Sequence, residues 1–231
     1  MGLVDGAFAE FVSVPVESLV AVPDRLDDEE AVLTHAVAIG LETIRAIPGF
    51  PPQRILVVGD GNMGLLLTQM LHAEGHTVSV VGRHPSRREL LWRSGIGFRV
   101  VADARTLTAE EWTHAIGEPF GVVVECSGRS SGFELAARAL RPRGRMIMIS
   151  DHAGQPGADL DILVRREVEI VGVSGGPLPP AVEYLGRRAI DVIPLIEAKA
   201  ALNDGVTAFE RAGQRGTLRT LLVRGRAVEE A

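Results

Sequence analysis

Three closely spaced glycines, Gly59, Gly61 and Gly64, are the residues in this sequence best suited to hold a phosphate. In a G-x-G-x-x-G turn the first glycine permits the tight bend and the second lets the backbone approach a pyrophosphate. The third lets the following helix pack against the strand, and the amides at the start of that helix point at the phosphates. The candidate contacts are therefore Gly59, Gly61, Asn62, Met63 and Gly64.

The elements around the turn support this interpretation. An apolar run at 55–58 precedes it, and a helical apolar pattern at 63–71 follows, as in the first strand and helix of a dinucleotide-binding βαβ unit. Further expected strands alternate with expected helices along the chain. Strands are predicted at 76–82, 98–101, 120–128, 144–150 and 168–175, and helices at 86–95, 109–116 and 131–142.

This alternation predicts an α/β fold, a doubly wound parallel sheet of the Rossmann type. Several of the strands are continuously apolar, which is typical of parallel strands that are covered on both faces. Ligands bind such sheets at the carboxyl ends of the strands, near the point where the strand order reverses. The glycine turn, after the first of these strands, is expected to lie at that point.

The two ends of the chain follow other patterns. Residues 7–22 are β-branched and apolar, and predict two short strands, or one strand and an extended connection. A helix is expected from about 27 to 47, with acidic residues in its first turn. After the break at 175–180 we expect a helix at 181–188, an extended stretch at 190–196, a helix at 203–214 and a strand at 218–225.

The end of the second expected strand indicates which cofactor the turn would take. NAD sites usually carry an acid about 20 residues after the glycines, but here the strand ends in Gly82 and Arg83. A small residue leaves room for a 2′-phosphate, and an arginine can bind one. This pattern predicts NADP(H), with Arg83 as the phosphate ligand and Ser86 and Arg87 assisting. Alternatively, these arginines form a solvated helix face that pairs with Glu89.

Composition excludes several other functions. The net charge of −6 and the 4% aromatic content argue against nucleic-acid partners. No apolar run is long enough to span a membrane, and the N-terminus lacks the pattern of a signal peptide. One cysteine, Cys126, allows no internal disulfide and no cysteine-rich zinc site, which favours a cytoplasmic protein.

Three stretches together resemble the medium-chain dehydrogenase/reductase superfamily, and its zinc-type alcohol dehydrogenase-like members in particular. They are GAFAEFVSVPVESLVAVPDRLDDEEAVL, ILVVGDGNMGLLLTQMLHAEGHTVSVVGR and VVVECSGRSSGFELAARALRPRGRMIMIS. The resemblance implies that 1–47 and 176–231 are remnants of a GroES-like catalytic domain, on either side of a Rossmann domain at 48–175. It also implies a homodimer joined through the strand edge at 168–174.

The resemblance departs from the family where zinc would bind. About a hundred residues of the catalytic domain, roughly a domain's worth, are not in the sequence, and the family's zinc ligands would lie there. Many relatives carry a glutamate that can approach the zinc at the position of His35. One histidine does not make a site that needs three protein ligands, so no zinc is predicted.

The remaining candidates lie near the expected cleft. His35, in the implied nicotinamide pocket, and His152, after the strand at 144–150, are the candidate proton donors or acceptors. The backbone of Ser127 and Gly128 is expected to line the cofactor. Cys126 is interpreted as a small buried hydrophobic residue, and Asp60 is expected to point to solvent.

The leading hypothesis is a truncated, zinc-independent oxidoreductase that binds NADP(H). It would transfer hydride to or from a small carbonyl, alcohol or alkene. Two alternatives stay open at this point. One is a non-redox enzyme, such as an isomerase or cyclase, that reuses the same cleft, and the other is a non-catalytic NADP(H)-binding module.

Overall fold

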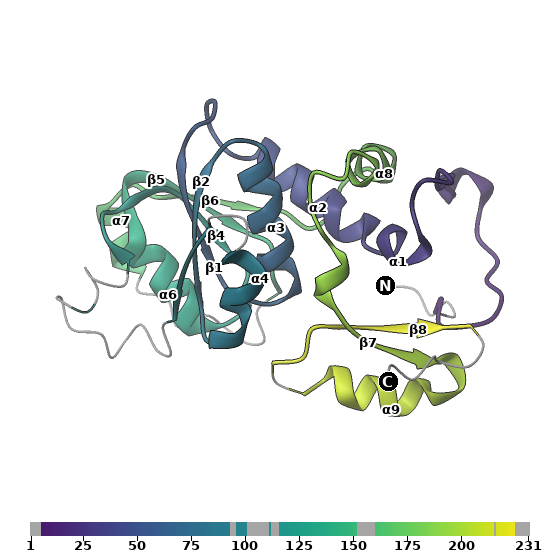
Figure 1. Cartoon of the computed structure of the whole chain (residues 1–231). Helices are drawn as coiled ribbons and strands as arrows, with labels where there is room; N and C mark the ends of the chain where they lie inside the picture. Colours follow the sequence, from purple (N-terminus) through teal and green to yellow (C-terminus); the bar gives the residue numbers. More distant parts are fainter. Residues whose placement is uncertain are drawn as a thin grey trace.

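The computed structural model describes residues 6–92, 96–100, 111, 116–151, 160–214 and 216–224. Its main part is a six-stranded sheet with helices on both faces, and a smaller two-stranded sheet lies beside it (Figure 1). Within this described part no helix is long and apolar enough to cross a membrane.

The large sheet is parallel throughout and has the strand order β3-β2-β1-β4-β5-β6. Its strands are β1 (Arg54–Val58), β2 (Thr77–Gly82), β3 (Gly97–Val100), β4 (Phe120–Glu125), β5 (Leu140–Met148) and β6 (Glu169–Gly172). The order reverses between β1 and β4, which are neighbours although two strands separate them in the sequence. The predicted doubly wound parallel sheet is confirmed.

Side chains of the central strands alternate between two apolar cores. Ile55 and Val57 of β1 face one core, and Leu56 and Val58 face the other. Successive strand side chains point to opposite faces, so a strand covered on both faces must be apolar throughout. This explains the unbroken apolar run before the glycine turn.

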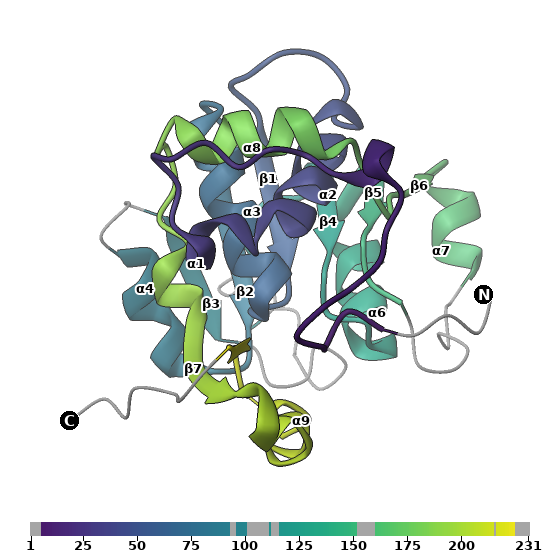
Figure 2. The ribbon, with the colours of Figure 1, turned by 90° about the vertical axis from the view of Figure 1, so that its right-hand side faces the viewer.

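Helices supply the opposite walls of these cores. The first core contains residues of α2 (Thr34–Arg45), α3 (Asn62–Ala73), α4 (Arg88–Trp92) and α8 (Leu178–Gly186). The second contains residues of α6 (Ser130–Ala139) and α7 (Leu160–Arg165). Figure 2 shows α2, α3 and α8 stacked in front of the large sheet.

The N-terminal segment corrects one expectation. Residues 7–22 form no strand in the described chain; they run extended, with a short 3-10 turn, η1 (Val16–Ser18). Most of their apolar side chains are exposed, among them Phe11 and Val16, both 79% exposed, whereas Val20 packs against the first core. A β-branched pattern specifies a strand only where a neighbouring strand can pair with it, and the described chain supplies none here.

Several helix boundaries also differ from the expected ones. The acidic stretch forms a separate turn, α1 (Asp28–Ala31), before α2. Helix α8 begins at Leu178, because prolines are tolerated in a first helical turn, where the N–H groups need no partner. Helix α6 ends at Ala139 and β5 starts at once, whereas a helix was expected to continue to 142. Helix α7 was not expected, and most of the expected helix 109–116 lies outside the described residues.

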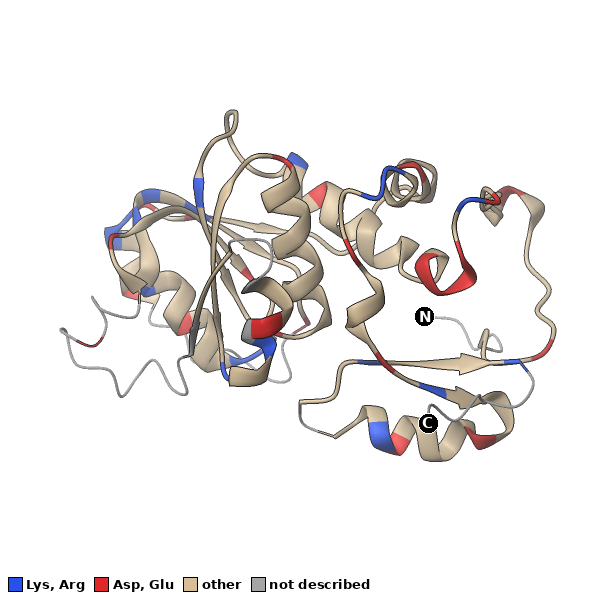
Figure 3. Ribbon diagram, in the orientation of Figure 1, with Lys and Arg blue, Asp and Glu red and all other residues tan. Residues whose placement is uncertain are grey.

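The C-terminal part forms the two-stranded parallel sheet of β7 (Ile196–Ala201) and β8 (Arg219–Val223), joined by α9 (Gly205–Ala212). Strand β7 starts where the expected extended stretch ends. The Lys199 ammonium lies 2.5 Å from the Glu29 carboxylate, linking β7 to the acidic α1, which is red in Figure 3. The rings of Phe8 and of Phe209 on α9 pack edge to face, with centroids 5.1 Å apart.

Candidate functional site at the switch point

The glycine turn between β1 and α3 is built by close backbone packing. Gly59 has a φ of +120°, and a Cβ on it would come within 2.9 Å of the backbone of Cys126 and Ser127. A Cβ on Gly64 would come within 2.1 Å of the Gly59 carbonyl oxygen. Both positions therefore require glycine for the fold, and the expected role of Gly64 in helix–strand packing is confirmed.

The middle glycine differs from the other two. A Cβ on Gly61 would meet no atom of the described chain within 4 Å. Gly61 is the N-cap of α3, a 12-residue helix, so the free backbone amides and the positive end of the helix dipole lie at this position. The protein fold does not require glycine here, whereas close approach of a ligand phosphate would.

A groove opens beside the turn, at the carboxyl ends of the strands where the order reverses. We call it the switch-point groove. It is lined by residues 58–61, by residues 81–84 at the end of β2, by Cys126 and Ser127 after β4, and by residues 129, 131, 132 and 135 around the start of α6. This is the location in which doubly wound sheets bind their ligands.

Four of the predicted cofactor contacts line this groove: Gly59, Gly61, Arg83 and Ser127. The other predicted contacts do not line it. Met63 packs against the first core, Gly64 is buried behind the turn, and Ser86 is exposed in the 3-10 turn η2 (Pro85–Arg87). Asn62 follows Gly61 as the first residue of α3, and Gly128 follows Ser127.

The loop after β4 is held by a buried carboxylate. Glu125 is fully buried, and its Oε1 accepts hydrogen bonds from the Ser127 amide at 2.8 Å and from the Ser127 hydroxyl. Gly128 has a φ of +62°, and a Cβ on it would lie 2.7 Å from the Asp151 carbonyl oxygen. Gly128 is thus a tight-turn residue that lets Ser127 reach the groove.

Cys126 is 9% exposed, and burial, together with the nearby Glu125 carboxylate, raises the pKa of its thiol well above the usual value. The thiolate is the reactive form of cysteine, so a raised pKa lowers its nucleophilicity. The interpretation of Cys126 as a small buried hydrophobic residue is confirmed.

Asp60 corrects the expectation that it points to solvent. It is only 6% exposed, and its Oδ2 accepts hydrogen bonds from the amides of Arg83 and His84, at 2.9 and 2.7 Å. The Nδ1 atom of His84 lies 3.0 Å from the same oxygen. Asp60 and His84 both line the groove. Sequence reasoning missed His84, because only the fold brings it to residue 60.

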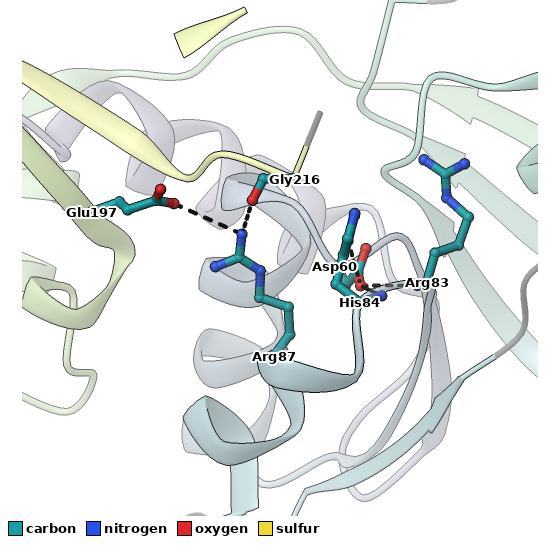
Figure 4. Close-up of polar contacts among 6 residues, drawn as sticks. All are labelled: Asp60, Arg83, His84, Arg87, Glu197 and Gly216. Atoms are coloured by element: carbon teal, nitrogen blue, oxygen red, sulfur yellow. Dashed lines mark hydrogen bonds and ion pairs between the residues drawn. The ribbon is translucent and has the colours of Figure 1, made fainter. Parts of the chain in front are cut away.

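The predicted arginines have different surroundings. The Arg83 guanidinium points away from Asp60 in Figure 4, and Arg83 is exposed at the edge of the groove. The Arg87 guanidinium instead donates a hydrogen bond to the Gly216 carbonyl oxygen and lies 3.9 Å from the Glu197 carboxylate. Arg87 contacts the C-terminal segment and is not in the groove lining. The structure therefore brings only Arg83 of the predicted phosphate ligands to the groove.

The two histidines proposed for proton transfer are not brought together in the described structure. His35 is exposed in the first turn of α2 and does not line the groove. His152 lies outside the described residues. Within the described ranges no three His, Cys, Asp or Glu side chains come close enough to hold a metal ion.

Residues 63–189 match the family model described as zinc-binding dehydrogenase. Sorbitol dehydrogenase from Halalkalibacterium halodurans is 24% identical over 226 residues, which are 94% of this chain and 65% of that protein. The chain thus spans somewhat less than two thirds of that relative's length.

Solved structures show the same fold. A putative zinc-binding dehydrogenase from Sinorhizobium meliloti, bound to NADP, has a TM-score of 0.81 at 20% identity and covers 95% of this chain and 66% of that one. A protein described as a short chain alcohol dehydrogenase from Escherichia coli, complexed with NADH, has a TM-score of 0.78 at 18% identity. The matched region makes up 91% of this chain and 64% of the Escherichia coli protein.

Proposed function

The chain belongs to the zinc-binding dehydrogenase family of the medium-chain dehydrogenases, and on that premise we propose that it is the cofactor-binding part of an NADP(H)-dependent oxidoreductase. The observation that carries the proposal is the glycine turn. It leaves Gly61 and the start of α3 open beside a groove at the switch point of the sheet. Such a turn binds a pyrophosphate through backbone amides.

The residues of the groove fit a dinucleotide in charge as well as in place. Amides at the start of α3 would hold the pyrophosphate, and the exposed Arg83 at the end of β2 would meet a 2′-phosphate on the adenosine ribose. When bound, the nicotinamide supplies hydride transfer. His35, in the first turn of α2 and outside the groove lining, and His152, outside the described residues, remain the proposed proton donors or acceptors.

The substrate is proposed to be a small alcohol, carbonyl compound or alkene. The name of the Halalkalibacterium halodurans relative makes a polyol such as sorbitol the first compound to test. We propose that this chain by itself binds no zinc, because its one cysteine and the lone His35 do not make the set of three protein ligands that such a site needs. Metal analysis of the purified protein by mass spectrometry tests that part of the proposal.

Cofactor binding is tested by fluorescence titration of the purified protein with NADPH and, in parallel, with NADH. We expect saturable binding of NADPH at lower concentration than of NADH. Absorbance at 340 nm, followed with a panel of polyols and carbonyl compounds, then tests hydride transfer. If neither cofactor bound, the proposed function would be wrong. Product formation without an absorbance change would instead support the non-redox alternative.

We also propose a homodimer joined through β6. This strand is one of the two edges of the large sheet, and Ile170 on it is 43% exposed. An edge strand presents unpaired N–H and C=O groups that a second copy can pair with. Light scattering after size-exclusion chromatography should give a dimer mass. The variant Ile170→Lys should shift it toward the monomer mass, because a charge on an edge strand disfavours pairing.

A further inference from the structure

The carboxylate of Asp60 occupies an anion-binding position in the groove, just after the end of β2. Two successive backbone amides, of Arg83 and His84, donate to its Oδ2 at 2.9 and 2.7 Å, and the His84 ring lies 3.0 Å away. Paired amides at the end of a strand form a small concave site that binds anions. Here the protein's own carboxylate fills that site.

The end of β2 is shaped for this carboxylate. Gly82 is the last residue of β2, and a Cβ on it would come within 2.4 Å of both Cβ and Cγ of Asp60. The absence of a side chain at Gly82 therefore makes room for Asp60. From the sequence, the same glycine was interpreted as leaving room for a 2′-phosphate.

We propose that Asp60 determines how strongly this protein discriminates between dinucleotides with and without a 2′-phosphate. The inference rests on the proposed function and deepens it. NAD sites usually place an acidic residue at the end of β2, where it bonds the ribose hydroxyls. In this chain the acid comes from the glycine turn instead, and its carboxylate reaches the same strand end.

The chemistry of the two ligands differs at this point. A ribose hydroxyl can donate a hydrogen bond to a carboxylate, whereas a phosphate cannot and is repelled by it. The two amides that could donate hydrogen bonds to a phosphate already donate them to Asp60. The groove thus holds two opposing determinants: Arg83 attracts a 2′-phosphate and Asp60 opposes it. Asp60 reduces the preference for NADP(H) that Arg83 alone would give.

The variant Asp60→Asn tests this assignment. Asparagine keeps the shape and one acceptor oxygen for the amides but removes the charge. Asp60→Ala removes the whole side chain and leaves both amides open. Asp161→Asn is the matched control, because it makes the same change in net charge on the exposed surface of α7.

Affinities are measured by calorimetric titration with NADH, NADPH, AMP and adenosine 2′,5′-bisphosphate. The last two compounds probe the adenosine end without a nicotinamide. In Asp60→Asn we expect the affinity for adenosine 2′,5′-bisphosphate, relative to AMP, to rise at least about tenfold, because a like-charge contact is removed. The ratio of NADPH affinity to NADH affinity should rise in parallel. Both ratios should also rise in Asp60→Ala, and neither should change in Asp161→Asn.

The outcomes separate the inference from the proposed function. In one outcome the nucleotides bind, but both ratios in Asp60→Asn and Asp60→Ala stay within about twofold of those of the unmodified protein. A twofold change is below about half a kcal/mol. Asp60 is then not a specificity determinant. If no nucleotide binds to any form of the protein, both proposals are overturned. Thermal melting of each variant identifies any that fail to fold. Asparagine at 60 keeps the fit beside Gly82, so that variant carries the test.

Discussion

The Arg87 guanidinium donates a hydrogen bond to the carbonyl oxygen of Gly216, which lies 129 residues further along the chain (Figure 4). The side chain of Arg87 is only 13% exposed, and it also approaches Glu197, whose carboxylate accepts a hydrogen bond from the Leu218 amide at 2.6 Å. Arg87 thus joins η2, which follows β2, to the loop before β8. Arg87, predicted from the sequence to assist Arg83 at the phosphate, contacts the C-terminal segment in the structure.

Replacing Arg87 by alanine should weaken that contact without changing cofactor preference. Hydrogen bonds to charged groups contribute about 1.5–3 kcal/mol, so the free energy of unfolding should fall by an amount of this order. Amide hydrogen exchange in β8 should rise. Arg165→Ala, which removes only an exposed ion pair with Asp161, should cost less than about 0.5 kcal/mol. A changed ratio of NADPH to NADH affinity in Arg87→Ala would indicate that Arg87 contributes to cofactor binding.

Replacing Arg83 by glutamate should shift binding from NADPH toward NADH. Arg83 is exposed at the groove, and a charge reversal beside a phosphate changes attraction into repulsion. We expect the affinity ratio to change by at least about tenfold, which is 1.4 kcal/mol. Titration with both cofactors measures it, with Arg165→Glu as the control for total charge. An unmoved ratio would contradict the assignment of Arg83 as phosphate ligand.

Glycines 61 and 64 should respond differently to substitution. Gly61→Val should abolish dinucleotide binding and leave the melting temperature nearly unchanged, because no described atom lies within 4 Å of the added Cβ. Gly64→Ala should destabilise the protein, because its Cβ would overlap the Gly59 carbonyl oxygen. Calorimetric titration and thermal melting of both variants check the contrast. Retained binding in Gly61→Val would contradict the pyrophosphate site.

The single tyrosine of the chain should ionise at unusually high pH. Burial, with a smaller contribution from the Glu74 carboxylate, raises the pKa of Tyr184 to about 12 from its usual value near 10. The folded state therefore favours the neutral phenol. The contribution of the neutral phenol to the free energy of unfolding is fully present below about pH 10. It is lost as the pH rises toward 12, and the total loss is up to about 2–3 kcal/mol. Absorbance at 295 nm should show ionisation near pH 10 in urea and well above it in the folded protein. Equal midpoints would contradict the prediction.

The thiol of Cys126 should resist modification in the folded protein. It is buried, and its raised pKa keeps it protonated at pH 8. Reaction with Ellman's reagent should be slow in buffer and fast and stoichiometric in denaturant. Because Cys126 lines the groove, saturating NADPH should slow the reaction further. Immediate full reaction of the native protein would show that the thiol is accessible.

The sequence by itself determined the class of fold and the place of the ligand site. Strand β1 carries Ile55 and Val57 to one core and Leu56 and Val58 to the other, so a run of apolar residues was enough to predict a strand covered on both faces. The glycine spacing after it marked the switch point, because the positive φ at Gly59 and the contact of Gly64 with the Gly59 carbonyl oxygen are local demands that only glycine meets. Local patterns of this kind can be read from one sequence.

Only the tertiary structure decided which charged groups meet at the site. Asp60 and His84 are 24 residues apart, and the usual spacing between the glycine turn and the end of β2 brings them near each other without predicting their hydrogen bond. Arg87 and Gly216 are 129 residues apart, and no spacing rule relates them. Their partners are set by the parallel pairing of β1 with β2 and by the docking of the C-terminal sheet. The same reasoning explains residues 7–22: their β-branched pattern required a neighbouring strand, and pairing is a property of the whole fold rather than of the segment. A residue type states what a side chain can bind, and the fold determines which partner it reaches.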